Sequence, residues 1–150
     1  MHEMLPAAKS VGLLKNPRNQ LADLITRDVL VAARAVGVEV QVLQAGTEGE
    51  IDAAFASLAQ ARTGALFVPN DIFFNDRITQ LVALAARYAV PTVYGIREFP
   101  LAGGLMSYGA SHAETYRLSG LQVARILNGE KPAHLPVIQL TKIELVVNLV

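Results

Sequence analysis

Short apolar segments alternate with amphipathic segments along the whole chain, and this alternation is the feature that most restricts its fold. Apolar runs predict strands at residues 10–14, 38–43, 65–68, 90–94 and 104–108, with a last strand-like run at 137–149. Apolar residues at helical spacing predict helices at residues 19–36, 47–61, 73–88 and 111–127. Strands and helices that alternate in short steps form a parallel sheet with right-handed crossovers. We therefore expect an α/β fold, a flavodoxin-like or Rossmann-like parallel sheet with helices on both faces.

Helix starts carry recognisable capping residues. Asn19 is placed to cap the first helix, because an Asn side chain accepts a hydrogen bond from a free backbone N–H of the first turn. Two capping boxes, in which a hydroxyl residue precedes a Glu by three positions, mark later helices: Thr47 with Glu50, and Ser111 with Glu114.

Composition limits the function. The 150 residues are 52% hydrophobic, which suits one domain with a real core, and we expect a disordered or extended segment at 1–9 before a single lobe at 10–150. The formal net charge is +0, so the basic surface that nucleic acid requires is missing. There is no Cys for a disulfide or a thiolate metal site. No apolar run approaches the ~20 residues of a membrane span.

The turns after the strands lack the motifs of common α/β enzymes. A dinucleotide site needs G-x-G-x-x-G after the first strand, where this chain has Lys15-Asn16-Pro17-Arg18-Asn19. Asp71 follows the third strand, as the phosphoacceptor of receiver domains does, but Lys15 and Asn16 stand where such domains carry acidic Mg²⁺ ligands. We therefore expect no catalytic residues, no metal site and no cofactor.

A polar loop between two apolar strands, within residues 90–111, is the best candidate for a ligand site. It carries Arg97, Glu98 and Phe99. Ligands of open parallel sheets bind outside the carboxyl ends of the strands, where Tyr94, Arg97 and Tyr108 are expected to stand.

Each candidate side chain also has a purely structural explanation. Asn16 and Asn19 suit turns and caps as well as ligand contact. Asp71 either reaches a ligand or caps the helix that follows it. Of the neighbours Phe73 and Phe74, one is expected in the core and the other in a cleft or against a partner.

An ordered series of motifs over nearly the whole chain resembles the second half of ABC-transporter substrate-binding proteins. These proteins have the two-domain type I periplasmic binding architecture, and the branch that the chain resembles includes tryptophan and tyrosine uptake proteins. The motifs are Asn16-Pro17-Arg18-Asn19, Glu50-Ile51-Asp52-Ala53-Ala54-Phe55, Phe73-Phe74, Leu81-Val82-Ala83-Leu84-Ala85-Ala86-Arg87, Arg97-Glu98-Phe99, Gly103-Gly104-Leu105-Met106-Ser107-Tyr108-Gly109, Gly129-Glu130-Lys131-Pro132 and Thr141-Lys142-Ile143-Glu144-Leu145-Val146-Val147-Asn148-Leu149.

The resemblance implies a solute-binding component of an ABC transporter, without catalysis. Its partners would be a small-molecule solute such as an amino acid and, in the full-length family, an ABC permease. Members of the branch differ in ligand, so the ligand does not transfer. The family is periplasmic or exported, whereas residues 1–10 contain no apolar signal core, which leaves a cytoplasmic form as an alternative. Matched positions place six residues at the ligand-facing edge: Asn16, Asn19, Asp71, Phe73, Arg97 and Tyr108.

Two further expectations compete with simpler ones. The alternative function is a stand-alone α/β regulatory or enzymatic domain that uses Asp71 and Arg97.

The resemblance also implies that the helix at 111–127 packs on another lobe, so we expect a homodimer in which 111–150 packs on, or swaps into, a second copy. The simpler alternative is a helix that folds back onto its own sheet. The apolar residues expected at this contact are Leu118, Leu121, Val123, Ile126 and Leu127.

Overall fold

The computed structural model describes residues 10–149, and the predicted segment at 1–9 lies outside them. Its sheet strands are β1 (Ser10–Lys15), β2 (Glu39–Gln44), β3 (Ala65–Val68), β4 (Thr92–Tyr94), β5 (Met106–Ala110) and β6 (Ile143–Val147). The helices are α1 (Ala22–Ala35), α2 (Glu48–Ala61), α3 (Ile72–Asn75), α4 (Ile78–Arg87), α5 (Glu98–Leu101), α6 (His112–Leu127) and the 3₁₀ turn η1 (Pro132–His134).

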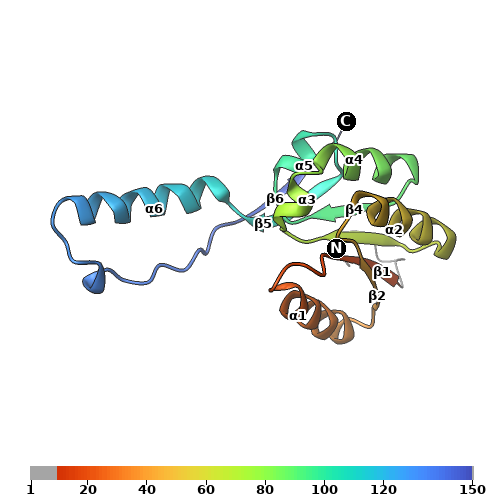
Figure 1. Cartoon of the computed structure of the whole chain (residues 1–150), viewed down its shortest axis with the longest axis horizontal. Helices are drawn as coiled ribbons and strands as arrows, with labels where there is room; N and C mark the ends of the chain where they lie inside the picture. The colour runs from red at the N-terminus through yellow and green to blue at the C-terminus, as the bar shows by residue number, and fades with distance from the viewer. Residues whose placement is uncertain (1–9, 150) are drawn as a thin grey trace.

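The strand order is β2-β1-β3-β4-β5-β6, and the first five strands are parallel, which confirms the predicted α/β class. The predicted last strand at 137–149 was too long, since only Ile143–Val147 is a strand, and it is antiparallel to β5. The chain returns to the sheet from the far end of α6 (Figure 1), so β6 meets the free edge of β5 while running in the opposite direction.

The two faces of the sheet are covered unequally. On one face α2 and α4 pack on the strands and form the main core, which includes Leu14, Ile51, Phe55, Leu66 and Leu81. Apolar strands such as β3 are expected in a parallel sheet that is covered on both sides. On the opposite face α1 lies against β1 and β2, below the sheet in Figure 1.

The predicted helix at 73–88 is two helices in the structure. α3 ends at Asn75, and Arg77, with φ −120° and ψ 28°, separates it from α4. The Arg77 guanidinium donates a hydrogen bond of 2.9 Å to the carbonyl oxygen of Phe73, which satisfies an acceptor that a continuous helix would use. The predicted loop at 95–103 likewise contains the short helix α5, whose Phe99 stacks on Tyr94 at 4.1 Å between ring centroids.

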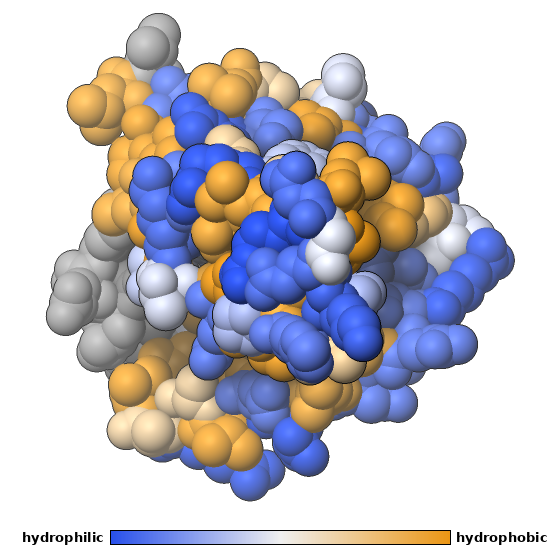
Figure 2. Space-filling view, turned by 90° about the vertical axis from the view of Figure 1, so that its left-hand side faces the viewer, coloured by the Kyte–Doolittle hydropathy of each residue, from blue (hydrophilic) through white to orange (hydrophobic). Residues whose placement is uncertain are grey.

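The helix α6 does not fold back onto its own sheet. Ser111 caps it as predicted, accepting a hydrogen bond from the Glu114 backbone N–H at 3.4 Å, but α6 has no buried residue. The helix and the returning segment form an arm (residues 111–142) that extends away from the body in Figure 1. Figure 2 views the molecule from the end of this arm and shows hydrophobic residues interspersed with hydrophilic ones. No helix among residues 10–149 is long and apolar enough to cross a membrane.

Two loops and strand β5 approach one another backbone to backbone at the carboxyl edge of the sheet. A Cβ atom built on Gly95 would lie 2.5 Å from the Asn70 backbone nitrogen, and one built on Gly109 would lie 2.0 Å from the Gly95 carbonyl oxygen. Backbone atoms cannot move aside as a flexible side chain can, so these two positions require glycine.

We therefore expect Gly109→Ala to lower the free energy of unfolding by about 2 kcal/mol or more, through overpacking against the backbone. Urea denaturation followed by circular dichroism measures it. Gly49→Ala in α2 is the matched control: nothing lies within 4 Å of its Cβ position, so it should raise stability by up to about 1 kcal/mol. Equal effects of the two substitutions would contradict the close approach.

Candidate functional site

The strand order places a crevice at the carboxyl ends of β1 and β3. From β1 the chain moves outward to β2, whereas from β3 it moves in the opposite direction to β4. The loops after the two strands therefore diverge, and ligands of open α/β sheets bind at such a switch point. The predicted residues Asn16 and Asn19 follow β1, and Asp71 and Phe73 follow β3.

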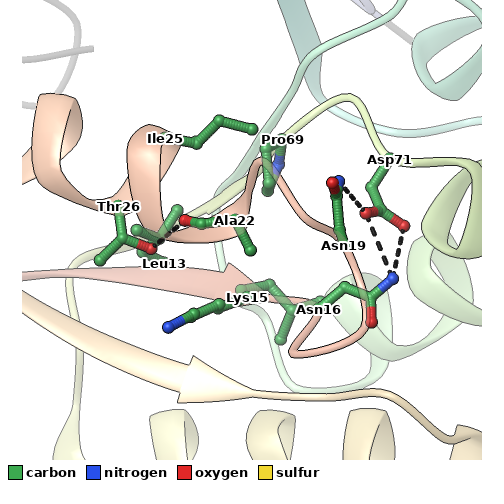
Figure 3. Close-up of a pocket in the computed structure, with 10 residues that line it drawn as sticks. Leu13, Lys15, Asn16, Asn19, Ala22, Ile25, Thr26, Pro69 and Asp71 are labelled. Atoms are coloured by element: carbon green, nitrogen blue, oxygen red, sulfur yellow. Dashed lines mark hydrogen bonds between the residues drawn. The ribbon is translucent and has the colours of Figure 1, made fainter.

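The Asp71 carboxylate joins these two loops (Figure 3). It accepts hydrogen bonds from Asn16 Nδ2, at 3.0 Å to Oδ1 and 3.2 Å to Oδ2, and from Asn19 Nδ2, at 2.6 Å to Oδ2. It also caps α3, since Oδ1 accepts from the Phe73 backbone N–H at 2.9 Å. The structural explanation for Asp71 is thus confirmed, and a carboxylate with about four lone-pair sites is fully used.

Each of the two asparagine side chains is held by a hydrogen bond within its own turn. Asn16 Oδ1 accepts from the Arg18 backbone N–H at 3.0 Å, and Asn19 Oδ1 accepts from the Leu21 backbone N–H at 2.8 Å. Both bonds span two residues, the pattern of an Asx turn. Asn19 was predicted to cap the first helix directly, but α1 begins at Ala22, so the Asx turn precedes the helix instead.

The floor beneath this network is closed. A cavity of about 10 Å³ lies between β1, α1 and Asp71, lined by Leu13, Ala22 and Ile25 among others. That volume is at the lower limit for a single water molecule. Asn16 and Asp71 are themselves buried, so a ligand has to approach from the outer side of the network.

On that outer side is an open cleft of about 710 Å³. Asn16, Asn19 and Asp71 form its base, and its walls include Arg18, Leu21, Ile72, Phe73, Asp76 and Arg77. The Arg77 guanidinium carbon lies 3.9 Å from the centre of the Phe73 ring, a cation–π contact. As predicted, one of the two phenylalanines enters the core, since Phe74 is fully buried while Phe73 is partly exposed.

The other predicted residues lie elsewhere. Arg97 forms an ion pair with Glu144 on β6 at 3.4 Å, and Tyr108 is exposed on β5 opposite Leu145. Neither is among the described residues that line the cleft. Tyr94 was expected at the ligand mouth but is fully buried in the core, because its side chain turns to the face that α4 covers. Burial raises the pKa of Tyr94 to about 12.

Sequence reasoning missed the two arginines of the cleft. Arg77 follows Phe73 by four residues, a spacing that brings side chains together on a helix, and Arg18 lies between the two predicted asparagines. Within residues 10–149, no three His, Asp or Glu side chains are grouped so that they could hold a metal ion.

Comparison with known proteins settles the family. A family model described as "ABC transporter substrate binding protein" matches residues 1–150. The chain belongs to this family. Comparison with curated protein sequences gave no match.

Solved structures agree with the fold at low sequence identity. A conserved domain protein from Vibrio cholerae is 21% identical with a TM-score of 0.85, and the alignment covers 97% of this chain and 49% of that one. A Streptococcus domain in complex with L-Trp is 20% identical with a TM-score of 0.83, covering 97% and 51%. A periplasmic solute-binding protein from Actinobacillus succinogenes with bound D-allose is 12% identical with a TM-score of 0.70, covering 98% and 55%. The chain thus spans about half the length of these proteins.

Removal of the Asp71 carboxylate should destabilise the lobe. Asp71→Ala deletes the cap of α3 and leaves the buried Asn16 amide without its acceptor, so we expect a loss of about 2–4 kcal/mol in the free energy of unfolding. Urea denaturation measures it. Asp76→Ala is the matched control on the same segment, exposed and expected to change stability by no more than about 0.5 kcal/mol. A loss for Asp71→Ala as small as the control's would show that the network does not hold the two loops together.

Proposed function

We propose that this chain is a solute-binding lobe of an ABC importer and that it holds a small molecule in the cleft above Asn16, Asn19 and Asp71. The observation that carries the proposal is the position of that cleft. It lies at the carboxyl ends of β1 and β3, at the switch point of the sheet, and polar and aromatic side chains from both loops line it.

The lining favours a ligand with a carboxylate and an apolar body, such as an amino acid. Arg18 supplies positive charge, and guanidinium groups bind carboxylates through paired hydrogen bonds. Arg77 adds positive charge to the same wall but already pairs with Glu48 at 3.5 Å. The ring of Phe73 offers an apolar surface that Arg77 already holds in place. Asn19 retains one amide hydrogen beyond its bond to Asp71, which is available to a ligand oxygen.

In this proposal Asp71 is a positioning residue. Its oxygens are occupied by Asn16, Asn19 and the Phe73 backbone, so it acts by fixing the amides and the first turn of α3. Arg97 and Tyr108 stand near the carboxyl ends of β4 and β5 and extend the same edge farther from α1. Arg97 would contact the outer part of a larger ligand, whereas Tyr108, opposite Leu145, lies on the other face of the sheet from the Arg97–Glu144 pair.

A stand-alone regulatory or enzymatic domain is the weaker alternative. Such a domain would need the Asp71 carboxylate free for phosphorylation or metal binding, but four hydrogen bonds occupy it. Arg97, the other residue of that hypothesis, pairs with Glu144. Addition of Mg²⁺ or a small phosphodonor should therefore leave the protein unchanged.

The proposal includes the setting in which the family works. Export to the periplasm and delivery of the solute to an ABC permease follow from family membership, and we extend both to this chain. A lobe that covers only one side of its ligand should bind weakly, with a dissociation constant of about 1 mM, which corresponds to about −4 kcal/mol.

An NMR titration tests the site. With ¹⁵N-labelled protein and L-Trp, L-Leu and D-allose as probes, we expect an amino acid to shift the side-chain amide signal of Asn19 and the backbone signals of residues 16–21 and 71–77. Arg18→Ala should weaken that binding by about threefold to tenfold, because one charged hydrogen bond is lost from an exposed position. The matched control Arg27→Ala removes an exposed arginine of α1 that pairs only with its neighbour Asp28, and binding should not change.

Two outcomes would contradict the proposal. One is the absence of any shift at these residues up to about 20 mM of each probe, well above the expected dissociation constant. The other is a set of shifts confined to a different part of the lobe.

A further inference from the structure

The start of α2 is tied to the start of α4 beside the cleft. Gln80 on α4 donates through Nε2 to the Glu48 carbonyl oxygen at 3.2 Å and to Asp52 Oδ1 at 3.1 Å. These bonds hold the first turn of α2 close to Arg77, the residue that precedes α4 and lines the cleft. Glu48 is not among the described residues that line the cleft, so any influence it has on a ligand must pass through another side chain.

Arg77 is the side chain that connects Glu48 to the cleft. Its Nη1 donates to the Phe73 carbonyl oxygen at 2.9 Å, and its guanidinium lies on the Phe73 ring. Its Nε is buried without a hydrogen-bond partner and lies 3.5 Å from Glu48 Oε1, so the two side chains form an ion pair. A buried N–H without a hydrogen bond is costly, and the negative charge of Glu48 offsets that cost. Glu48 therefore holds the guanidinium of Arg77 and neutralises its charge.

The second carboxylate in the first turn of α2 has a different role. Glu50 Oε2 accepts a hydrogen bond from the Gly46 backbone N–H at 2.7 Å. This bond is the main reason that the pKa of Glu50 lies below its usual value, and the charge of Arg18 makes a smaller contribution. Glu50 thus fixes the loop before α2, and among the described residues no ion pair links it to Arg18.

Two charged side chains of the cleft are left without an ion pair inside the described part of the chain. They are Arg18 and Asp76, one cation and one carboxylate. Asp71 does not add to them, because its oxygens are occupied by the asparagine amides and the Phe73 backbone. The cleft therefore offers a ligand one uncompensated charge of each sign.

We propose that Glu48 is a positioning residue that sets the charge selectivity of the cleft through Arg77. By neutralising Arg77, it leaves the cleft suited to a zwitterion with one carboxylate and unsuited to a ligand with two. A second carboxylate would need a second free cation, and it would also be repelled by Asp76. Selectivity is a difference between two affinities, and here it arises from the weaker binding of the dicarboxylate. The inference rests on the proposed function, since the ligand has to occupy this cleft.

A pair of ligands of nearly equal size tests the selectivity. L-Gln and L-Glu differ by one carboxylate, and NMR titration of the unaltered chain should give tighter binding of L-Gln. Glu48→Gln keeps the size of the side chain and removes its charge, which frees Arg77. We expect it to raise the affinity for L-Glu relative to L-Gln by about twofold to fivefold. The change is modest because the Glu48 side chain is 70% exposed and water screens its pair with Arg77.

Matched variants separate this effect from a general change in charge or stability. Asp52→Asn removes the same charge one turn later on α2, where the carboxylate faces Gln80, and the ratio of the two affinities should not change. In a chain with both Glu48→Gln and Arg77→Gln, the gain for L-Glu should disappear, because Arg77 is the group through which Glu48 acts. A purely structural role of Glu48 would weaken the binding of both ligands equally. Circular dichroism verifies that the variants fold.

One measurement needs no ligand. The Nε–H signal of Arg77 in the ¹⁵N spectrum, identified by its loss in Arg77→Gln, should shift in Glu48→Gln and stay in place in Asp52→Asn. An unmoved signal in Glu48→Gln would overturn the inference. So would an unchanged ratio of the L-Glu and L-Gln affinities, or a gain for L-Glu that persists without Arg77. If L-Leu and L-Trp do not bind either, the proposed function fails and the inference fails with it, a result distinct from binding with an unchanged ratio.

Discussion

The apolar side chains on both faces of the parallel sheet need a covering layer, and most features of this lobe follow from how that need is met. On one face α2 and α4 bury Leu14, Leu66 and Tyr94 completely. On the other, α1 covers only the part nearest β1 and β2. Because the crossovers of a parallel sheet are right-handed, the chain cannot freely choose where its helices lie. On the face that α1 covers, the part of the sheet at β5 and β6 is left without a helix among the described residues.

The Asp71 network shows how a structural requirement and the proposed binding site share the same atoms. A carboxylate after β3 caps α3 and draws the two asparagine amides of the β1 turn toward itself. Its donors are all neutral, so the positive charge of Arg18 in the cleft remains available to an anionic group on a ligand, whereas Arg77 already pairs with Glu48 at 3.5 Å. The proposed site is therefore organised before a ligand arrives, which would lower the entropy cost of binding.

Sequence patterns were sufficient where the controlling interactions are local. β3 was predicted with its observed bounds, and both capping boxes supply the expected hydroxyl acceptors, from Thr47 and Ser111. The four residues Asn16, Asn19, Asp71 and Phe73 were expected at one edge, and the structure brings them to one cleft, because strand ends of a parallel sheet meet there.

The failures depend on contacts that are distant in sequence or on the direction of a side chain. Arg97 binds Glu144, 47 residues away, and no local pattern indicates such a pair. Tyr94 lies in a strand that is apolar on both sides, so alternation could not show which way its ring points. The division of α3 from α4 depends on the guanidinium of Arg77 reaching back to Phe73, which helix periodicity does not reveal.

Because α6 is attached to the body only at its first residues, a small rotation at its base produces a large displacement at its far end. At its base the Ser111 backbone N–H donates to the Lys142 carbonyl oxygen at 3.2 Å, and β5 and β6 run side by side into it. The 16 residues of the helix span about 24 Å, so a rotation of only about 10° at Ser111 displaces its far end by about 4 Å. Small changes in the twist of β5 and β6 are thereby magnified at Leu127. The geometry of a two-stranded ribbon thus sets where a surface more than four helical turns away is presented.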